Sequence, residues 1–186
     1  YKTDAGEWSD IYTVSNTTHV RRGDPDANIS EDGVIGVVWS EEGLPADTLA
    51  AELCYRERSA AGVWSSSVQV TTDGADGKKE YVEASLDFDS DSNPRMIAAS
   101  KQYVPGEAMD VWYLQRSAGV WSTEHVATAG HANTIAMICN MVIGSDNSIY
   151  AGYLLQGTPY PLYIRKRSPT GTCSSVEAVT VSGTSA

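Results

Sequence analysis

The sequence predicts an all-β chain made of repeated four-stranded antiparallel sheets. Two observations support this prediction: a Gly-x-Trp-Ser phrase recurs along the chain, and β-prone stretches fill the space between its copies. The phrase stands at 6–9, 62–65 and 119–122, and at 171–174 with cysteine in place of tryptophan. A spacing of about 55 residues filled with strands is typical of β-propeller blades. We therefore expect a partial β-propeller of three four-stranded antiparallel blades plus one extra strand.

The repeat at 73–128 shows the four strands of a blade most clearly. Residues 84–89 alternate apolar and polar, and a turn cluster at 90–94 follows them. The next strands are predicted at 95–100, 109–117 and 120–128. The same order predicts strands at 27–30, 34–40, 49–59 and 63–72 before this repeat, and at 135–143, 148–155, 162–168 and 172–181 after it. No segment shows the 3.6-residue apolar period of a helix.

These strands divide the chain into units of similar length. The three blades are predicted at 19–72, 73–128 and 129–181. Residues 1–18 supply the last strand of a preceding blade, and 182–186 the start of the next. Known propellers close with about four to eight blades, so three cannot form a ring. We expect the remaining blades to come from the same longer chain or from other subunits.

The turn between the third and fourth strands carries a short motif. It reads Ser-x-x-Gly-x-Trp at 59–64 and Ser-x-Gly-x-Trp at 117–121. This motif resembles the Asp-box of sialidase-like, or BNR-repeat, propellers, although the aspartate is missing from every copy. The resemblance implies a structural role, in which the serine and glycine shape the hairpin and the tryptophan packs between strands.

Composition excludes several partners. The net charge is −11, and the few basic runs are short, so the chain lacks the basic surface that nucleic-acid binding requires. No apolar run reaches the length needed to cross a bilayer, and no membrane insertion is expected. The three cysteines, Cys54, Cys139 and Cys173, show no metal-binding spacing.

Long loops on one face of the predicted propeller are the expected place for a ligand, because function often sits on loops held by a rigid scaffold. These loops include 19–26, 41–48 and 73–83. Tyrosines on such loops can stack on a sugar ring or a peptide, and neighbouring polar side chains can bind hydroxyl groups. The predicted ligand-binding residues are Tyr81, Tyr103, His131, Asn133 and Tyr160. The alternative is that they are solvated loop residues.

An acidic run follows the first strand of the middle blade. Its alternating oxygen ligands could hold Ca²⁺ in a tight loop, and they resemble the DxDxDG loops of integrin-type propeller blades. The candidate metal ligands are Asp87, Asp89, Asp91 and Asn93. Ser92 replaces the glycine of such loops, and Arg95 stands where a later carboxylate is expected. These departures favour a solvated acidic hairpin over a calcium site.

No catalytic residue is predicted. Sialidases bind the substrate carboxylate with an arginine cluster, and Arg58, Arg116 and Arg167 invite that comparison. These three arginines occupy one equivalent position in successive blades, which favours a repeated structural task such as holding a turn carbonyl. A glycosidase also needs two carboxylates about 5–10 Å apart, and the sequence predicts no such pair.

The sequence as a whole favours a non-catalytic recognition module. We expect it to bind glycans or another surface ligand as part of a larger extracellular, cell-surface or virion-associated protein. This setting rests on analogy between folds. One alternative is part of a sialidase-like glycoside hydrolase whose catalytic residues lie partly in other blades. A structural or assembly propeller is the other alternative.

Overall fold

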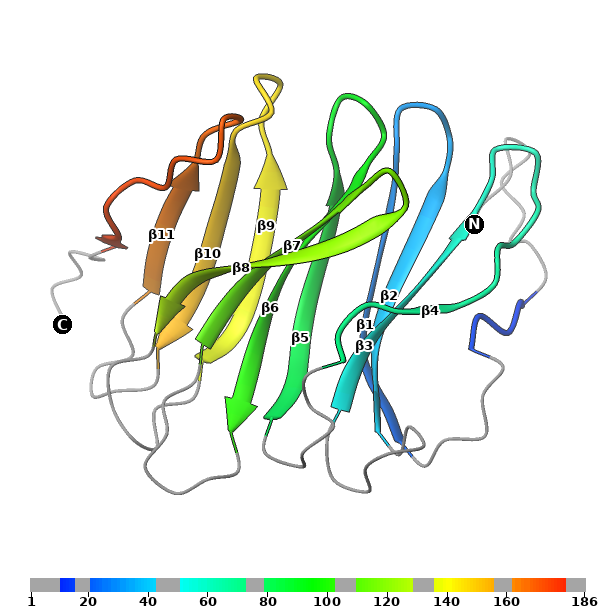
Figure 1. Ribbon diagram of the computed structural model, residues 1–186, viewed down its shortest axis with the longest axis horizontal. Coiled ribbons are helices and arrows are strands. Elements are labelled where there is room, and N and C mark those ends of the chain that lie inside the picture. The colour runs from blue at the N-terminus through cyan, green and yellow to red at the C-terminus, as the bar shows by residue number, and fades with distance from the viewer. Residues whose placement is uncertain are drawn as a thin grey trace, which may run out of the picture.

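The computed structural model describes residues 11–15, 21–42, 51–72, 79–102, 110–128, 136–155 and 162–179. These residues form twelve strands, arranged as three four-stranded antiparallel sheets, and they contain no helix (Figure 1). Nothing in this described part is therefore a helix long and apolar enough to cross a membrane. The predicted all-β architecture of three blades is confirmed.

Each sheet is made by four strands that follow one another in the chain. Blade 1 consists of β1 (Arg21–Ile29), β2 (Ile35–Glu42), β3 (Ala51–Arg58) and β4 (Val68–Gln69). Blade 2 consists of β5 (Lys79–Phe88), β6 (Pro94–Gln102), β7 (Asp110–Ser117) and β8 (Val120–Thr128). Blade 3 consists of β9 (Ala136–Ile143), β10 (Ile149–Leu155), β11 (Leu162–Arg167) and β12 (Glu177–Val179). Every pair of consecutive strands within a blade is antiparallel and hydrogen-bonded.

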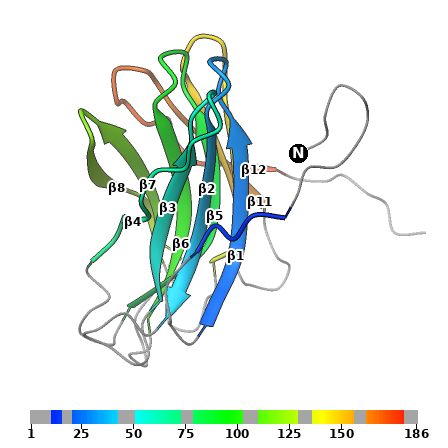
Figure 2. The ribbon, with the colours of Figure 1, turned by 90° about the vertical axis from the view of Figure 1, so that its right-hand side faces the viewer.

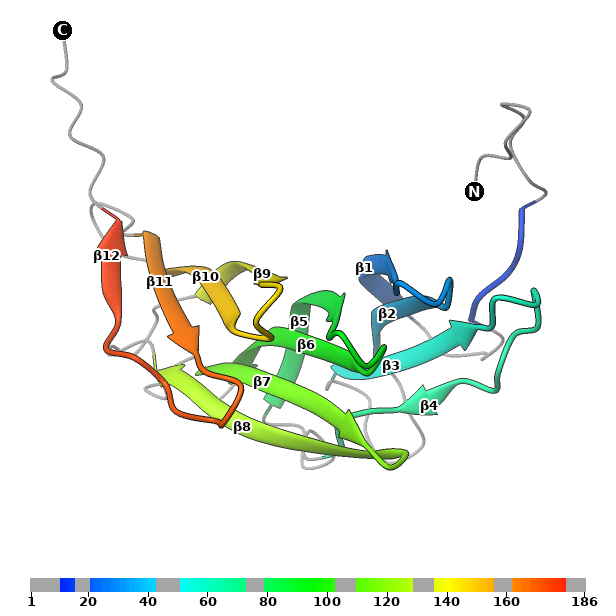
Figure 3. The ribbon, with the colours of Figure 1, turned by 90° about the horizontal axis from the view of Figure 1, so that it is seen from above.

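The blades stand side by side along an arc. Their first strands, β1, β5 and β9, lie next to one another on the concave side, and the fourth strands lie away from it (Figure 3). Seen edge-on, β1 marks one border of the stack, and β4 and β8 mark the opposite border (Figure 2). The first strands are therefore the inner strands of the propeller.

The turn motif has the structural role that the Asp-box resemblance implies. The Oγ of Ser59 accepts a hydrogen bond from the N–H of Val63 over 3.2 Å, and Gly62 has a φ of 89°. Residues other than glycine rarely adopt such a φ. The third blade repeats this geometry with Ser168 and Gly171. These turns lie at the same edge of the arc as the hairpins between first and second strands (Figure 1).

Apolar side chains fill the spaces between blades. Between blades 1 and 2 the buried cluster includes Leu53 and Tyr55 from blade 1, and Leu86 and Met96 from blade 2. The Asp-box tryptophan Trp121 packs edge-on against Tyr55, with ring centroids 5.3 Å apart. A second cluster joins blade 2 to blade 3. Two successive junctions thus hold the three sheets in their arc.

Several strand ends differ from the sequence prediction. The inner strands β1 and β5 begin earlier than expected, because each continues through a β-bulge that keeps it paired with its neighbour. Residues 21–26 and 79–83 are therefore strand rather than loop. The fourth strands β4 and β12 are shorter than expected, and Trp64 and Cys173 form only isolated bridges with Arg58 and Arg167. Residues 11–15 form no strand.

Candidate functional site on the inner strands

Most of the predicted ligand-binding residues fall on segments that the structure does not describe. Four of the five lie outside the described residues: Tyr103, His131, Asn133 and Tyr160. The fifth, Tyr81, lies in β5, where it is 1% exposed and packs in the core between blades 1 and 2. The prediction that Tyr81 is a loop aromatic open to a ligand is therefore wrong, because β5 begins at Lys79 and carries Tyr81 into the sheet.

The acidic hairpin is closed by its own hydrogen bonds. Asp89, which is 8% exposed, accepts hydrogen bonds from the N–H groups of Asp91 (3.0 Å) and Asn93 (2.9 Å). The Arg95 guanidinium forms an ion pair with the same carboxylate. Burial alone would raise the pKa of Asp89, but these hydrogen bonds and Arg95 outweigh it and hold the pKa below its usual value.

Asp87, the first candidate calcium ligand, accepts hydrogen bonds from both neighbouring blades. Its Oδ2 accepts a hydrogen bond from the N–H of Ile143 in blade 3 over 2.9 Å, and its Oδ1 accepts one from Nδ2 of Asn28 in blade 1. The acidic run therefore holds a turn and links blades, and its candidate calcium ligands Asp87 and Asp89 are engaged in these contacts. Across the described ranges, no group of three or more His, Cys, Asp and Glu side chains could hold a metal ion.

A hollow of about 260 Å³ opens beside the inner strands. Residues 24–26 of β1 and 83–85 of β5 line it, together with Asn140 of β9. Three of the lining side chains are carboxylates: Asp24, Asp26 and Glu83. Since β1, β5 and β9 form the concave side of the arc (Figure 3), this hollow belongs to the axial side of the propeller.

The two acidic segments of the hollow share one backbone conformation. Asp24 has a φ of 48° and Glu83 a φ of 51°, and both residues stand in β-bulges. Asp24 lies two residues before Asp26, which pairs with Val38 of β2. Glu83 lies two residues before Ser85, which pairs with Ile97 of β6 at the equivalent position of blade 2. A positive φ in a residue other than glycine costs of order 1–3 kcal/mol and is found preferentially at functional sites. Its occurrence at equivalent acidic positions marks this hollow as the candidate site.

Two other side chains of the hollow connect the blades. Oδ2 of Asp26 accepts a hydrogen bond from the N–H of Leu86 over 2.7 Å. At the equivalent position of the next blade, Oγ of Ser85 accepts one from the N–H of Met141 over 3.3 Å. These bonds fix the spacing of the inner strands, and so they fix the positions from which the bulges present Asp24 and Glu83.

The arrangement can accept hydrogen bonds from a ligand that carries hydroxyl or amino groups, because ionised carboxylates are acceptors only. The sequence prediction places a ligand on segments 19–26 and 73–83 but selects neither Asp24 nor Glu83, because the bulges that present these carboxylates are not visible in the sequence. A signal was present, however. Asp24 and Glu83 each precede the hairpin of their blade by about the same number of residues, and a repeated acidic position on an inner strand could have been recognised from that register.

The three repeated arginines do not reach this hollow; two of them join consecutive blades. Arg116 donates to Oε2 of Glu57 in blade 1, and Arg167 donates to Oε2 of Glu124 in blade 2. Each guanidinium also lies over a tyrosine ring of the preceding blade, at 5.3 Å from the centroid of Tyr55 for Arg116. The repeated structural task predicted from the sequence is therefore a contact between blades rather than a bond to a turn carbonyl.

Comparison with known proteins identifies the fold. No protein-family model matches the sequence, and no curated protein sequence is significantly similar to it. Among solved structures, the Hadza microbial sialidase Hz136 superposes with a TM-score of 0.50 over 85% of this chain. The chain folds as part of a sialidase-like β-propeller.

The match to Hz136 is a match of folds over part of that protein. Sequence identity to Hz136 is 10%, so the likeness concerns the fold alone. The chain spans 44% of the length of Hz136, less than half of that propeller protein. The sialidase-like propeller fold was expected from the degenerate Asp-box turns, and the superposition supports it independently of those motifs.

Proposed function

We propose that this sialidase-like propeller segment is a recognition module that binds a neutral, hydroxyl-rich glycan at the hollow between β1 and β5. The observation that carries the proposal is the pair of positive-φ carboxylates, Asp24 and Glu83, at equivalent positions of neighbouring inner strands. Carboxylates accept hydrogen bonds from sugar hydroxyls, and charge-assisted bonds of this kind are stronger than neutral ones. The proposed setting is a larger extracellular, cell-surface or virion-associated protein.

The charge of the hollow selects among glycans. A sialic acid or another anionic sugar would bring its carboxylate close to Asp24, Asp26 and Glu83, and like charges at short range disfavour binding. Arg116 and Arg167, which could otherwise neutralise an anionic sugar, are engaged between blades. A neutral glycan, with no charge to repel, is therefore the ligand class that fits this hollow.

A second candidate function is glycoside hydrolysis. Two carboxylates from adjacent strands on one hollow are the side chains that a glycosidase uses as acid and as base or nucleophile. The similarity of the fold to Hz136, which is a sialidase, also favours glycoside hydrolysis as a candidate function. The same two residues, Asp24 and Glu83, would then carry catalysis on a neutral glycoside.

The test is a glycan-array screen of the full 186-residue chain, followed by calorimetric titration of any neutral glycan that binds. Asp24→Asn and Glu83→Gln are expected to weaken binding about tenfold each, since each removes a hydrogen bond to a charged acceptor. Asparagine is tolerated at positive φ, so Asp24→Asn keeps the bulge. Glu31→Gln, at an exposed hairpin position, is the matched control and should leave affinity unchanged.

Hydrolysis of a panel of chromogenic neutral glycosides separates the two functions. Turnover that is lost in both Asp24→Asn and Glu83→Gln would replace the recognition proposal by the hydrolase. Binding without turnover supports recognition. If no neutral glycan binds or reacts, or if binding is unchanged in both variants, the hollow is not the site.

A further inference from the structure

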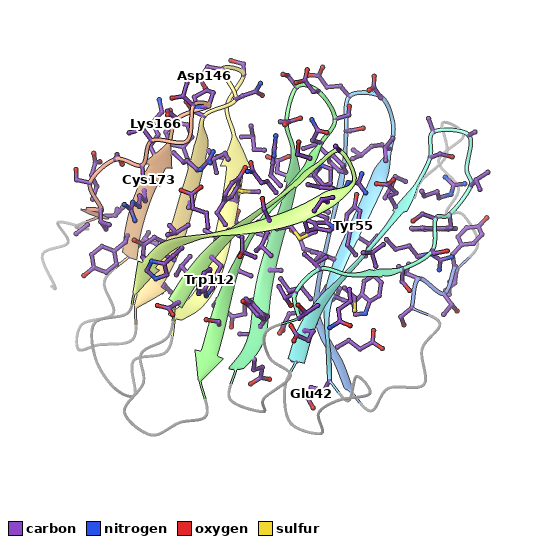
Figure 4. The ribbon with its side chains drawn as sticks, viewed as in Figure 1. Glu42, Tyr55, Trp112, Asp146, Lys166 and Cys173 are labelled. Carbon is purple, nitrogen blue, oxygen red and sulfur yellow. The ribbon has the colours of Figure 1, made fainter. Side chains whose placement is uncertain are left out.

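A second hollow, of about 200 Å³, opens between blades 2 and 3, and its lining residues differ from all those of the hollow beside the inner strands. Blade 2 lines it from β6, β7 and the turn after β5, and blade 3 lines it from β9, β10, β11 and the turns that follow β9 and β11. It therefore lies at the hairpin edge of the arc, where Figure 4 labels Asp146, the neighbour of the lining residue Asn147. The volume equals that of roughly seven water molecules and so suits a small ligand.

The corresponding place between blades 1 and 2 is filled by an aromatic ring. Gly36 of β2 leaves room for Phe88, the last residue of β5, because a Cβ at Gly36 would lie 2.8 Å from Cζ of that ring. Tyr55 of β3 closes the same place, with its Cε2 3.0 Å from the position of that Cβ. Packed side chains therefore close the first junction at this point.

The second junction differs from the first at three equivalent positions. Arg95 and Gln115 stand opposite each other on β6 and β7, as Gly36 and Glu57 do on β2 and β3. The last residue of the inner strand is Ile143 rather than a phenylalanine. An arginine thus replaces a glycine, an amide replaces a carboxylate, and an aliphatic side chain replaces a ring. These changes give a polar hollow in place of a packed ring, so the hollow is a property of this junction and does not follow from the repeat.

Two side chains of this hollow have hydrogen-bond donors to spare. Arg167 donates from Nε and Nη2 to Glu124, and its Cζ lies 4.6 Å from the ring centroid of Tyr113, so its guanidinium is held in place. Oε1 of Gln115 accepts a hydrogen bond from Nη1 of Arg95. Within the described ranges, neither Nη1 of Arg167 nor Nε2 of Gln115 has a hydrogen-bond partner. Both groups only donate, and a carboxylate is the acceptor that matches a guanidinium best.

The turn after β5 contributes a carboxylate to the same hollow. Asp91 is exposed, and no donor in the described part of the chain binds its side chain. Asp89 differs from it, because the N–H groups of the turn and the Arg95 guanidinium already occupy its oxygens. A carboxylate accepts hydrogen bonds and attracts a positive charge, so Asp91 suits an ammonium group of the ligand.

The charges of the hollow balance one another. Its described lining contains two guanidinium groups, Arg95 and Arg167, and two carboxylates, Asp89 and Asp91. A ligand with one positive and one negative group keeps this balance, whereas an anion would add negative charge to a chain of net charge −11. We propose that this hollow binds a small zwitterion of the α-amino-acid class. The ligand's carboxylate lies at Arg167 and Gln115, and its ammonium group lies at Asp91.

The test is a titration of the full 186-residue chain with L-alanine. Saturation-transfer NMR measures the affinity, and the side-chain amide resonance of Gln115 should shift as the ligand binds. Propionate lacks the ammonium group and L-alanine methyl ester lacks the carboxylate, so each should bind at least tenfold more weakly than alanine. Equal affinity for alanine and either comparison compound would overturn the proposal of a zwitterion. Failure of alanine to shift the Gln115 resonance would overturn the site.

Two polar variants test the named contacts. Gln115→Glu introduces the residue type of the first junction: it keeps an acceptor for Arg95 but removes the amide donor, and alanine affinity should fall at least tenfold. Asp91→Asn removes the charge that holds the ammonium group and should weaken binding about tenfold. Glu31→Gln removes a carboxylate from the exposed hairpin of blade 1 and is the matched control, which should leave the affinity unchanged.

A filling variant tests the hollow without changing its polar groups. Ile143→Phe supplies the ring type that fills the first junction, and it should abolish alanine binding while urea unfolding remains that of a folded chain. Asp24→Asn, in the hollow beside the inner strands, should leave alanine binding unchanged, which separates this site from the proposed glycan site. Alanine binding that is unchanged in both Gln115→Glu and Asp91→Asn, or in folded Ile143→Phe, would contradict the proposal.

Discussion

Arg116 donates a hydrogen bond from Nη2 to Oε2 of Glu57 over 2.7 Å, and this contact joins blade 2 to blade 1. The guanidinium also lies over the rings of Tyr55 and Trp121. Burial, followed by the negative charge of Glu57, raises the pKa of Tyr55 well above its usual value, so this tyrosine stays neutral across the ordinary pH range. The contact therefore combines an ion pair, a cation–π interaction and an aromatic pair at one junction.

Arg116→Gln should lower the free energy of unfolding by about 1–2 kcal/mol, because it removes both the charge and the planar group above the rings. Arg116→Lys should recover only part of this loss, since an ammonium does not reproduce the stacking geometry of a guanidinium. Urea denaturation measures both. A double-mutant cycle with Glu57→Gln should give a coupling of about 1 kcal/mol; a coupling of zero would contradict the role assigned to the pair.

The hairpin carboxylate of Asp89 should make stability depend on pH. The pKa of Asp89 is lower in the folded chain than the usual value for an aspartate. The ionised carboxylate therefore stabilises the folded chain fully when the pH is above that usual value. This stabilisation is lost as the pH falls from the usual pKa toward the folded pKa. The free energy of unfolding should decrease from about pH 6 to about pH 3 more steeply in the parent chain than in Asp89→Asn. Equal slopes in the two proteins would show that the Arg95 pair has no energetic role.

Tyr81 offers a direct check on its reassignment from loop to core. Tyr81→Ala should cost about 3–5 kcal/mol of unfolding free energy, as other large-to-small changes of buried aromatic residues do. Tyr150→Ala is the matched control, because the Tyr150 side chain is 37% exposed, and it should cost less than about 1 kcal/mol. Similar costs in the two variants, measured by thermal or urea unfolding, would contradict the buried position of Tyr81.

Gly36 marks a close approach between blades 1 and 2. A Cβ at this position would lie 2.8 Å from Cζ of Phe88 and 3.0 Å from Cε2 of Tyr55. Gly36→Ala should therefore destabilise the chain by about 1–3 kcal/mol through overpacking. Gly152→Ala is the control on the open side of blade 3, where the nearest atom to a Cβ is 3.9 Å away, and it should be neutral or slightly stabilising. Equal effects would show that the junction relaxes around the added methyl group.

The sequence alone determined the number of blades, the order of their strands and the chemistry of their turns. Each of these depends on neighbours in the chain: alternation within a strand, and residues such as Gly62 and Gly119 that adopt positive φ in a hairpin. A repeat of fixed period then places the same local pattern in each blade. The degenerate Asp-box could therefore indicate the propeller without its aspartate.

Only the tertiary structure decided which side chains meet. Arg116 and Glu57 come together because the blades pack side by side, and no local pattern fixes that packing angle. Tyr81 is buried, and Asp24 faces a hollow, because the inner strands continue through bulges that alternation does not predict. The exposure of Leu162 and Ile164 is likewise a property of position in the arc, since equivalent residues in the other blades are covered by a neighbour.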